Sequence, residues 1–364
     1  MVESGSQGMG CMVDDYLQGL VIAPADQQAA ESAQRQWNAV AKPLGSLGLL
    51  EEAIVKVAAL TGTAQVDLSR RCVVVFCSDN GVVAQGVSQC DREVTAVVAS
   101  NIARGISSVS RMCEGLDIDC LAVDMGIACE PEGNNLISRR IAAGTGDITQ
   151  GPAMTREQAL AAVRAGVELA GELASEGYRI IGAGEMGIGN TTTAAAVICA
   201  LTGAKPSEVV GRGAGLSNAG LTRKVRAVEA ALVQNAPCST DPLGVLAAVG
   251  GFDLCGMCGL FLGGAVHRVP VVVDGIISSV AALCARRMRE ECTMAMLASH
   301  LSSEPAARLV MDELGLTPPL QAGMHLGEGT GAACLIPLLD MALRLYRGTT
   351  FDDCGIEPYE ELPR

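Results

Sequence analysis

The chain has 364 residues, of which 49% are hydrophobic, 18% charged and 2% aromatic, with a formal net charge of −14. This composition excludes a largely disordered chain, and it argues against nucleic-acid binding, which uses basic patches and stacking rings. Binding of an anionic substrate must therefore depend on a local site, because the overall charge repels anions.

Neither end of the chain nor its apolar segments predict a membrane protein. Residues 1–16 contain acids but no Lys or Arg, which is unlike a signal peptide. The most apolar stretch, 254–266, is too short to span a bilayer and is rich in glycine. We expect a cytoplasmic protein with no membrane partner.

The 15 cysteines and three histidines do not predict a metal site. Most cysteines lie in apolar runs, as small core residues do. Cys255 and Cys258 form a C-x-x-C without a second pair, for which packing is the commoner explanation. The histidines lack ligand spacing and no acidic cluster resembles a magnesium site, so we expect neither a metal nor a cofactor.

Apolar runs and helical periodicity alternate along the whole chain. This order predicts an α/β fold with a doubly wound, mostly parallel sheet whose two faces are covered by helices. Strands are expected at 72–77, 117–123, 178–181, 269–273 and 293–297. Helices are expected within 1–40 and at 49–60, 93–104, 155–173, 194–201, 221–233, 243–262, 276–288, 304–314 and from about 326 to 346.

The glycine-rich segment 182–193 is the strongest candidate for a ligand site. It follows an apolar strand and precedes a small-residue helix that Asn190 or Thr191 could cap and Gly203 could end. Gly187 and Gly189 would let the backbone approach a ligand, and the helix start offers free N–H groups to a phosphate. The segment lacks the lysine of a Walker loop, and a plain tight turn between strand and helix remains the alternative.

Polar residues recur where the predicted strands end. In open α/β sheets these ends line the ligand crevice, although an acid after a strand is often only a turn former or a cap. These residues are Asp79, Asp124, Glu185, Asp274 and His300.

Two carboxylates are set among glycines, Glu185 and Glu328. A glutamate held against an apolar wall should have a raised pKa, which suits a general base near neutral pH. Lys224 and Ser302 are candidate phosphate contacts, although each could be an ordinary surface lysine or helix cap. With no nucleophile elbow in the sequence, the residues favour direct displacement on a phosphate-bearing substrate without a metal.

Several motifs occur in the order that is typical of one enzyme family. The chain resembles the nicotinate-nucleotide:dimethylbenzimidazole phosphoribosyltransferases, which activate the lower base of cobalamin. The motifs are KPLGSLG at 42–48, GV at 81–82, GVS at 86–88, EVT at 93–95, PAMTREQ at 152–158, GEMGIGNTT at 184–192, GRG at 211–213, HLSSEP at 300–305 and LGEG at 326–329.

The resemblance implies a large doubly wound domain over 66–324 that carries the site, and a smaller helical domain from 1–65 plus about 325–364. It implies transfer of 5-phosphoribosyl from nicotinate mononucleotide to an aromatic lower-ligand base, with inversion to the α-glycoside, by a homodimer or a pseudosymmetric heterodimer with a paralogue. The resemblance implies Glu328 as general base, phosphate contacts at Gly187, Gly189, Lys224 and Ser302, and a base pocket of Ser88, Met186, Leu326 and Glu328. To these we add Asn190 and Thr191 as candidate phosphate and ribose contacts, and Glu185 as a residue that is either catalytic or shapes the site.

The chain departs from the family pattern at three positions that the resemblance assigns to the base side. Asn80 stands where the family has histidine, Cys90 where it has tyrosine, and Val97 where it has glutamine. A valine makes no hydrogen bond to a ring nitrogen, so we expect an acceptor range that includes phenols; neutral drift around a benzimidazole site is the alternative. Two other functions stay open at this point, a non-catalytic subunit that supports an active paralogue and a nucleotide-binding kinase or ATPase.

Overall fold

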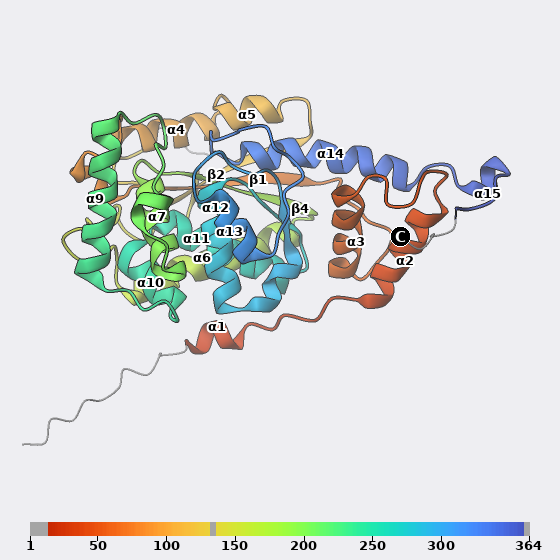
Figure 1. Ribbon diagram of the computed structural model, residues 1–364, viewed down its shortest axis with the longest axis horizontal. Coiled ribbons are helices and arrows are strands. Elements are labelled where there is room, and N and C mark those ends of the chain that lie inside the picture. Colours follow the sequence, from red (N-terminus) through yellow and green to blue (C-terminus); the bar gives the residue numbers. More distant parts are fainter. Residues whose placement is uncertain (1–13, 132–135, 360–364) are drawn as a thin grey trace, which may run out of the picture.

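The protein is built on a six-stranded, all-parallel sheet in the order β3-β2-β1-β4-β5-β6. The computed structural model in Figure 1 describes residues 14–131 and 136–359. The strand order reverses between β1 and β4, and a crevice for ligands forms at such a reversal. The strands are β1 (Arg71–Ser78), β2 (Ile118–Gly126), β3 (Ile137–Ser138), β4 (Ile180–Met186), β5 (Val271–Val273) and β6 (Met296–Ala298).

Side chains of β1 alternate between two hydrophobic clusters, one on each face of the sheet. Val74 and Phe76 belong to the first cluster, Val73 and Val75 to the second, and all four are fully buried. This double burial explains why β1 reads as a continuous apolar run. The predicted doubly wound, parallel α/β fold is therefore confirmed.

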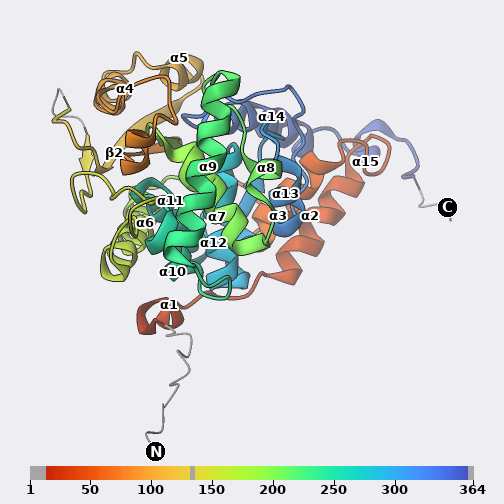
Figure 2. The ribbon, with the colours of Figure 1, turned by 60° about the vertical axis from the view of Figure 1, so that its left-hand side comes forward.

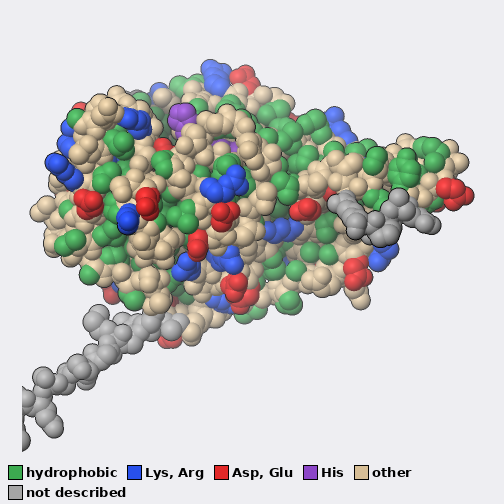
Figure 3. Space-filling view, in the orientation of Figure 1, with side chains coloured by type: hydrophobic (Ala, Val, Ile, Leu, Met, Phe, Trp, Pro, Cys, Tyr) green, Lys and Arg blue, Asp and Glu red, His purple; other side chains and the backbone are tan. Residues whose placement is uncertain are grey.

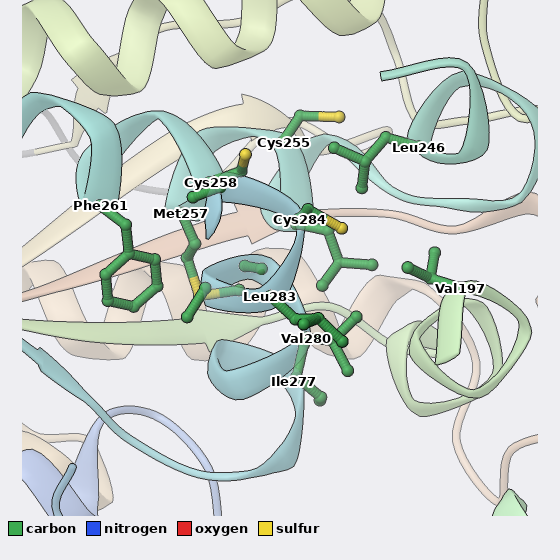
Figure 4. Close-up of a cluster of buried hydrophobic side chains, with 14 of the residues drawn as sticks. Val197, Leu246, Cys255, Met257, Cys258, Phe261, Ile277, Val280, Leu283 and Cys284 are labelled. Atoms are coloured by element: carbon green, nitrogen blue, oxygen red, sulfur yellow. The ribbon is translucent and has the colours of Figure 1, made fainter. Parts of the chain in front are cut away.

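The first face is covered by helices from the middle and later parts of the chain. Figure 2 shows these helices grouped together, and Figure 4 shows the core between α7, α10, α11 and α12. The helices of this face are α6 (Arg156–Ser175), α7 (Asn190–Thr202), α8 (Pro206–Val209), α9 (Asn218–Asn235), α10 (Pro242–Val249), α11 (Phe252–Val266), α12 (Ile276–Met288) and α13 (Ala307–Leu314).

Helices from both ends of the chain cover the second face. They are α2 (Gln27–Ala39), α3 (Leu49–Thr61), α4 (Glu93–Ala103), α5 (Ser108–Cys113) and α14 (Thr330–Tyr346). In Figure 1, α2, α3 and the short α15 (Phe351–Cys354) lie at one end of the molecule, and α14 runs toward them. Their buried side chains belong to the same cluster as the sheet face, and the division into two domains stays a prediction.

Most predicted elements occur within a few residues of their expected limits, but two differ in ways that matter for the site. Strand β4 continues to Met186, so 182–185 belong to the sheet and not to a loop. The expected helix 243–262 is two helices, separated at Gly250 and Gly251. A Cβ atom at Gly251 would lie 2.4 Å from Asp253 Oδ1, so this break places Asp253 in the first turn of α11.

Short elements were not expected from the pattern. They are the 3-10 turns η1 (Gly81–Gln85) and η2 (Glu290–Ala295), α5, α8, β3 and α15, whereas the short α1 (Asp15–Gly19) lies within the helical range expected over 1–40. Turn η2 occupies part of the expected last strand, which is reduced to β6. No helix of the described residues is both long and apolar enough to cross a bilayer.

Candidate active site

A cavity of about 320 Å³ opens at the carboxyl ends of β4, β5 and β6, beside the reversal of strand order. It brings together most of the residues that the sequence predicts. Its lining includes Ser88, Glu185, Met186, Gly187, Gly189, Asn190, Thr191, Asp274, His300, Ser302, Leu326 and Glu328.

The loop between β4 and α7 forms the floor of the cavity. A Cβ atom at Gly187 would lie 2.4 Å from the Ser78 carbonyl oxygen, so only glycine fits there. Gly189 has φ +93° and is the N-cap of α7. The expectation that Asn190 or Thr191 caps this helix is wrong, because both already lie within α7. The start of α7 carries the partial positive charge of the helix, and its first residues, Asn190 and Thr191, line the cavity.

Lys224 lies one layer behind this loop and is completely buried. Its Nζ donates to Thr191 Oγ1 at 2.7 Å and to the Gly211 carbonyl at 3.2 Å. Burial lowers the pKa of Lys224 to about 8, and the charge of Glu304 opposes this shift. Lys224 does not line the cavity, and Thr191 lies between its ammonium group and the cavity. Lys224 therefore acts on the cavity by its charge and not by direct contact.

Asn190 joins two buried carboxyl groups, of which Glu185 lines the cavity and Asp253 lies behind it. Its Nδ2 donates to Glu185 Oε2 and, at 3.1 Å, to Asp253 Oδ2. Burial raises the pKa of Glu185 well above its ordinary value, and the nearby Asp253 raises it further. Burial likewise raises the pKa of Asp253 to about 6, although the Asn190 hydrogen bond opposes the shift. A carboxyl group held in its protonated form can donate a hydrogen bond to a substrate oxygen.

Glu328 sits at the opposite wall in a left-handed backbone conformation, with φ +57°. Its Oε2 accepts a hydrogen bond from the Val109 backbone N–H at 3.1 Å, at the start of α5. The segment packs closely on β4, since a Cβ atom at Gly184 would lie 2.7 Å from the Glu328 carbonyl. The glycines around both glutamates therefore allow two backbones to approach, which brings Glu185 and Glu328 to one cavity.

Only some of the residues expected at the base side line the cavity. Ser88, Met186 and Leu326 line it, and Cys90 does so as well. Val97 and Asn80 do not: Val97 is 58% exposed on α4, and Asn80 is buried beside the Ile188 carbonyl oxygen. Asn80 thus supports the glycine loop from beneath.

Sequence reasoning missed several residues that shape this site. The break before α11 brings Asp253 close to Glu185. The glycine pair at 250–251 is the feature of the sequence from which this break could have been predicted. Arg212 and Glu304 also line the cavity. For Asp124 the alternative of a local structural role holds, because it accepts from the Ile127 N–H and pairs with Arg140 outside the lining. Within 14–131 and 136–359 no group of acidic, His and Cys side chains could hold a metal ion.

The chain is similar to known proteins along nearly its whole length. A family model described as phosphoribosyltransferase matches residues 22–356. The nicotinate-nucleotide–dimethylbenzimidazole phosphoribosyltransferase of Acetivibrio thermocellus is 41% identical over 335 residues, which cover 92% of this chain and 95% of that protein. The protein of the same name from Chloroflexus aggregans is also 41% identical, with 93% and 97% covered.

Solved structures agree with the sequence relatives. CobT from Thermus thermophilus superposes with a TM-score of 0.86 at 40% identity, and the match covers 91% of this chain and 99% of that one. A second structure, the nicotinate-nucleotide–dimethylbenzimidazole phosphoribosyltransferase of the same organism, gives a TM-score of 0.84 at 39% identity.

Proposed function

Because this chain belongs to the phosphoribosyltransferase family, we propose that it transfers the 5-phosphoribosyl group of nicotinate mononucleotide to an aromatic base in cobamide assembly. The observation that carries this proposal is the meeting of an anion-binding glycine loop with Glu328 across one cavity. A phosphoribosyl donor needs the glycine loop for its phosphate, and an N–H or O–H acceptor needs Glu328 to take its proton.

The phosphate of the donor would bind over Gly187–Gly189 and the start of α7, where the partial positive charge of the helix lies. Ser302 lines this cavity, and the ammonium group of Lys224 lies behind Thr191. The helix start, Lys224 and the cavity-lining Arg212 provide a local positive field in a chain whose net charge is −14. Anchoring the phosphate holds C1′ of the ribose at a fixed distance from Glu328.

The chemistry is a single displacement at C1′. The acceptor nitrogen forms a bond to C1′ as the bond to the nicotinate nitrogen breaks, and that electron pair neutralises the pyridinium. Glu328 takes the acceptor proton. Because attack comes from the face opposite the leaving group, the β-nucleotide gives an α-glycoside. Glu185 in its protonated form would donate a hydrogen bond within the site.

The acceptor range is the less constrained part of the proposal. We propose that benzimidazoles are accepted and that phenols compete with them to give an O-linked glycoside. Val97 no longer supports this extension, because it lies outside the cavity. Its support is the apolar acceptor wall of Val87, Val94 and Leu326, and Cys90 at the position of a family tyrosine.

Competition between acceptors tests this extension. Equal concentrations of 5,6-dimethylbenzimidazole and p-cresol would be offered, and the products identified by mass. A phenolic glycoside is the expected second product. Formation of the benzimidazole product alone, even at high enzyme concentration, would remove phenols from the proposal.

We also propose that the chain works as a dimer. Exposed apolar side chains lie along α4, α5 and α14, among them Val97, Met112 and Met341. Figure 3 shows hydrophobic side chains gathered along α14. Light scattering after gel filtration distinguishes the forms: a dimer of the isolated chain indicates a homodimer, and a monomer that pairs only with a paralogue indicates a heterodimer. Exclusive monomer in both cases would contradict the proposal.

The two other functions receive no support. The relatives are named phosphoribosyltransferases, and neither a kinase nor a silent subunit is among their names. The deciding experiment incubates the purified chain with nicotinate mononucleotide and dimethylbenzimidazole and measures nicotinate release. We expect turnover by the wild type and its loss in Glu328→Gln, with the exposed Glu157→Gln as a matched control that keeps it. No turnover by the wild type, alone or with a paralogue, would reject the proposed function.

A further inference from the structure

We propose that Asp274 is a positioning residue for Glu328: by capping the start of α14 it fixes the backbone from which the catalytic carboxylate projects. The inference rests on the proposed function, since it concerns how the general base of that reaction is held. Asp274 follows β5, about 50 residues before Glu328 in sequence, and lines the same cavity.

The side chain of Asp274 takes the place of a missing helix cap. The N-cap of α14 is Gly329, which has no side chain to satisfy the first N–H groups of the helix. Asp274 Oδ1 accepts from the N–H of Gly331 at 2.6 Å and of Ala332 at 3.1 Å, and Oδ2 accepts from Gly329 at 3.2 Å. A buried acceptor directly after β5 therefore sets the position of the first turn of α14.

The residue just before this turn needs such support. Gly327, Glu328 and Gly329 have φ values of +89°, +57° and +85°. Glycine adopts this conformation freely, but a glutamate does so only against steric cost, and such a residue persists when its surroundings hold it. The bond from Gly329 N–H to Asp274 acts on the residue directly after Glu328.

The other groups packed around the first turn of α14 are held by their own contacts. Asp274 is therefore the contact whose substitution can move this turn. A Cβ atom at Gly331 would lie 2.0 Å from His300 Nδ1, so His300 closes the space beside the cap. His300 Nδ1 lies 3.1 Å from Ser299 Oγ, which holds the ring. On the far side, β4 meets Glu328 at Gly184. Burial raises the pKa of Asp274 to about 6, while the backbone N–H groups oppose that shift, as expected for an acceptor-only role of the carboxylate.

The test separates positioning from general stability. Asp274→Asn keeps one acceptor oxygen but turns an NH₂ group toward a backbone N–H, and Asp274→Ala keeps none. We expect kcat to fall about tenfold or more in Asp274→Asn and further in Asp274→Ala, while the KM for nicotinate mononucleotide changes by less than about threefold. The matched control is Asp26→Asn, another helix cap, whose Oδ1 accepts from the Ala29 N–H at 2.9 Å. It should lower Tm without changing kcat per folded molecule.

A double-mutant cycle shows whether Asp274 acts through Glu328. In single-turnover assays at high enzyme concentration, Asp274→Asn should change the residual rate of Glu328→Gln by less than about twofold. An equal effect in both backgrounds, or wild-type kcat in folded Asp274→Asn, would overturn the inference. If Asp274→Asn does not fold, Asp274→Ser, which keeps one neutral acceptor, carries the same test. Since these outcomes are read against an active wild type, they are distinct from failure of the proposed function.

Discussion

Replacing Lys224 by methionine should separate the binding role of this residue from its cost to the fold. The substitution keeps an unbranched side chain that is one atom shorter and removes its charge. Burial lowers the pKa of Lys224 from 10.5 to about 8. At about 1.4 kcal/mol for each tenfold change, the buried ammonium form is disfavoured by roughly 3 kcal/mol. This cost is fully present below pH 8 and is relieved as pH rises toward 10.5.

Methionine also leaves Thr191 Oγ1 and the Gly211 carbonyl without their donor. Each unpaired buried acceptor costs about 1–3 kcal/mol, so the two together cost about 2–6 kcal/mol and largely offset the roughly 3 kcal/mol that is relieved. We therefore expect the free energy of unfolding at pH 7 to change by no more than about 3 kcal/mol. A direct charge-assisted hydrogen bond would contribute about 1.5–3 kcal/mol, or about 10- to 150-fold in affinity. Because Lys224 lies behind Thr191, loss of its charge should weaken donor binding by an amount at or below the lower end of this range.

The assay is denaturant unfolding together with calorimetric titration of nicotinate mononucleotide. Lys56→Met is the matched control, because Lys56 is also a lysine whose pKa burial lowers to about 8. Its Nζ donates to the Met296 carbonyl at 2.7 Å, outside the cavity lining. The control should leave donor affinity unchanged. Wild-type affinity in Lys224→Met would refute the argument, and so would an equal loss in both variants.

The donor affinity of the wild type should fall as pH rises through about 8, because the Lys224 ammonium is present below that pKa and lost above it; titrations from pH 7 to 9 measure this, and a flat profile would contradict it. Gly184→Ala should destabilise the fold by about 1–3 kcal/mol and lower kcat, because its Cβ would lie 2.7 Å from the Glu328 carbonyl. Unfolding curves measure the first effect and the nicotinate-release assay measures the second. Wild-type stability and wild-type kcat would show that the contact relaxes freely. EDTA should leave the rate unchanged, and an activity lost to EDTA and restored by Mg²⁺ would contradict the metal-free displacement.

Local patterns in the sequence were enough to predict the parallel sheet and its covering helices. The run at 72–77 is apolar throughout, as a strand buried on both faces must be, and Thr155, of a residue type favoured at helix starts, is the N-cap of α6. Gly203 ends α7 as expected, in a left-handed conformation that glycine favours. These features depend on neighbours within a few residues, so the sequence carries them directly.

The same reasoning placed Glu185 and Glu328 together only through their position among glycines and at strand ends. It assigned 182–185 to a loop, whereas these residues form β4, because glycine is unfavourable in strands unless another backbone must approach closely. The approaching backbone is that of Glu328, more than 140 residues later. No local pattern contains that partner.

Only the tertiary structure decided which polar groups share an environment. Val97 was expected at the acceptor and lies on an exposed helix face, while Asp253 and Asp274 reach the site from distant segments. The sequence determines which residues can bear charge and where the chain turns. Burial, shared hydrogen bonds and the pKa shifts that follow from them arise from contacts between segments far apart in the chain, and those contacts exist only once the sheet has formed.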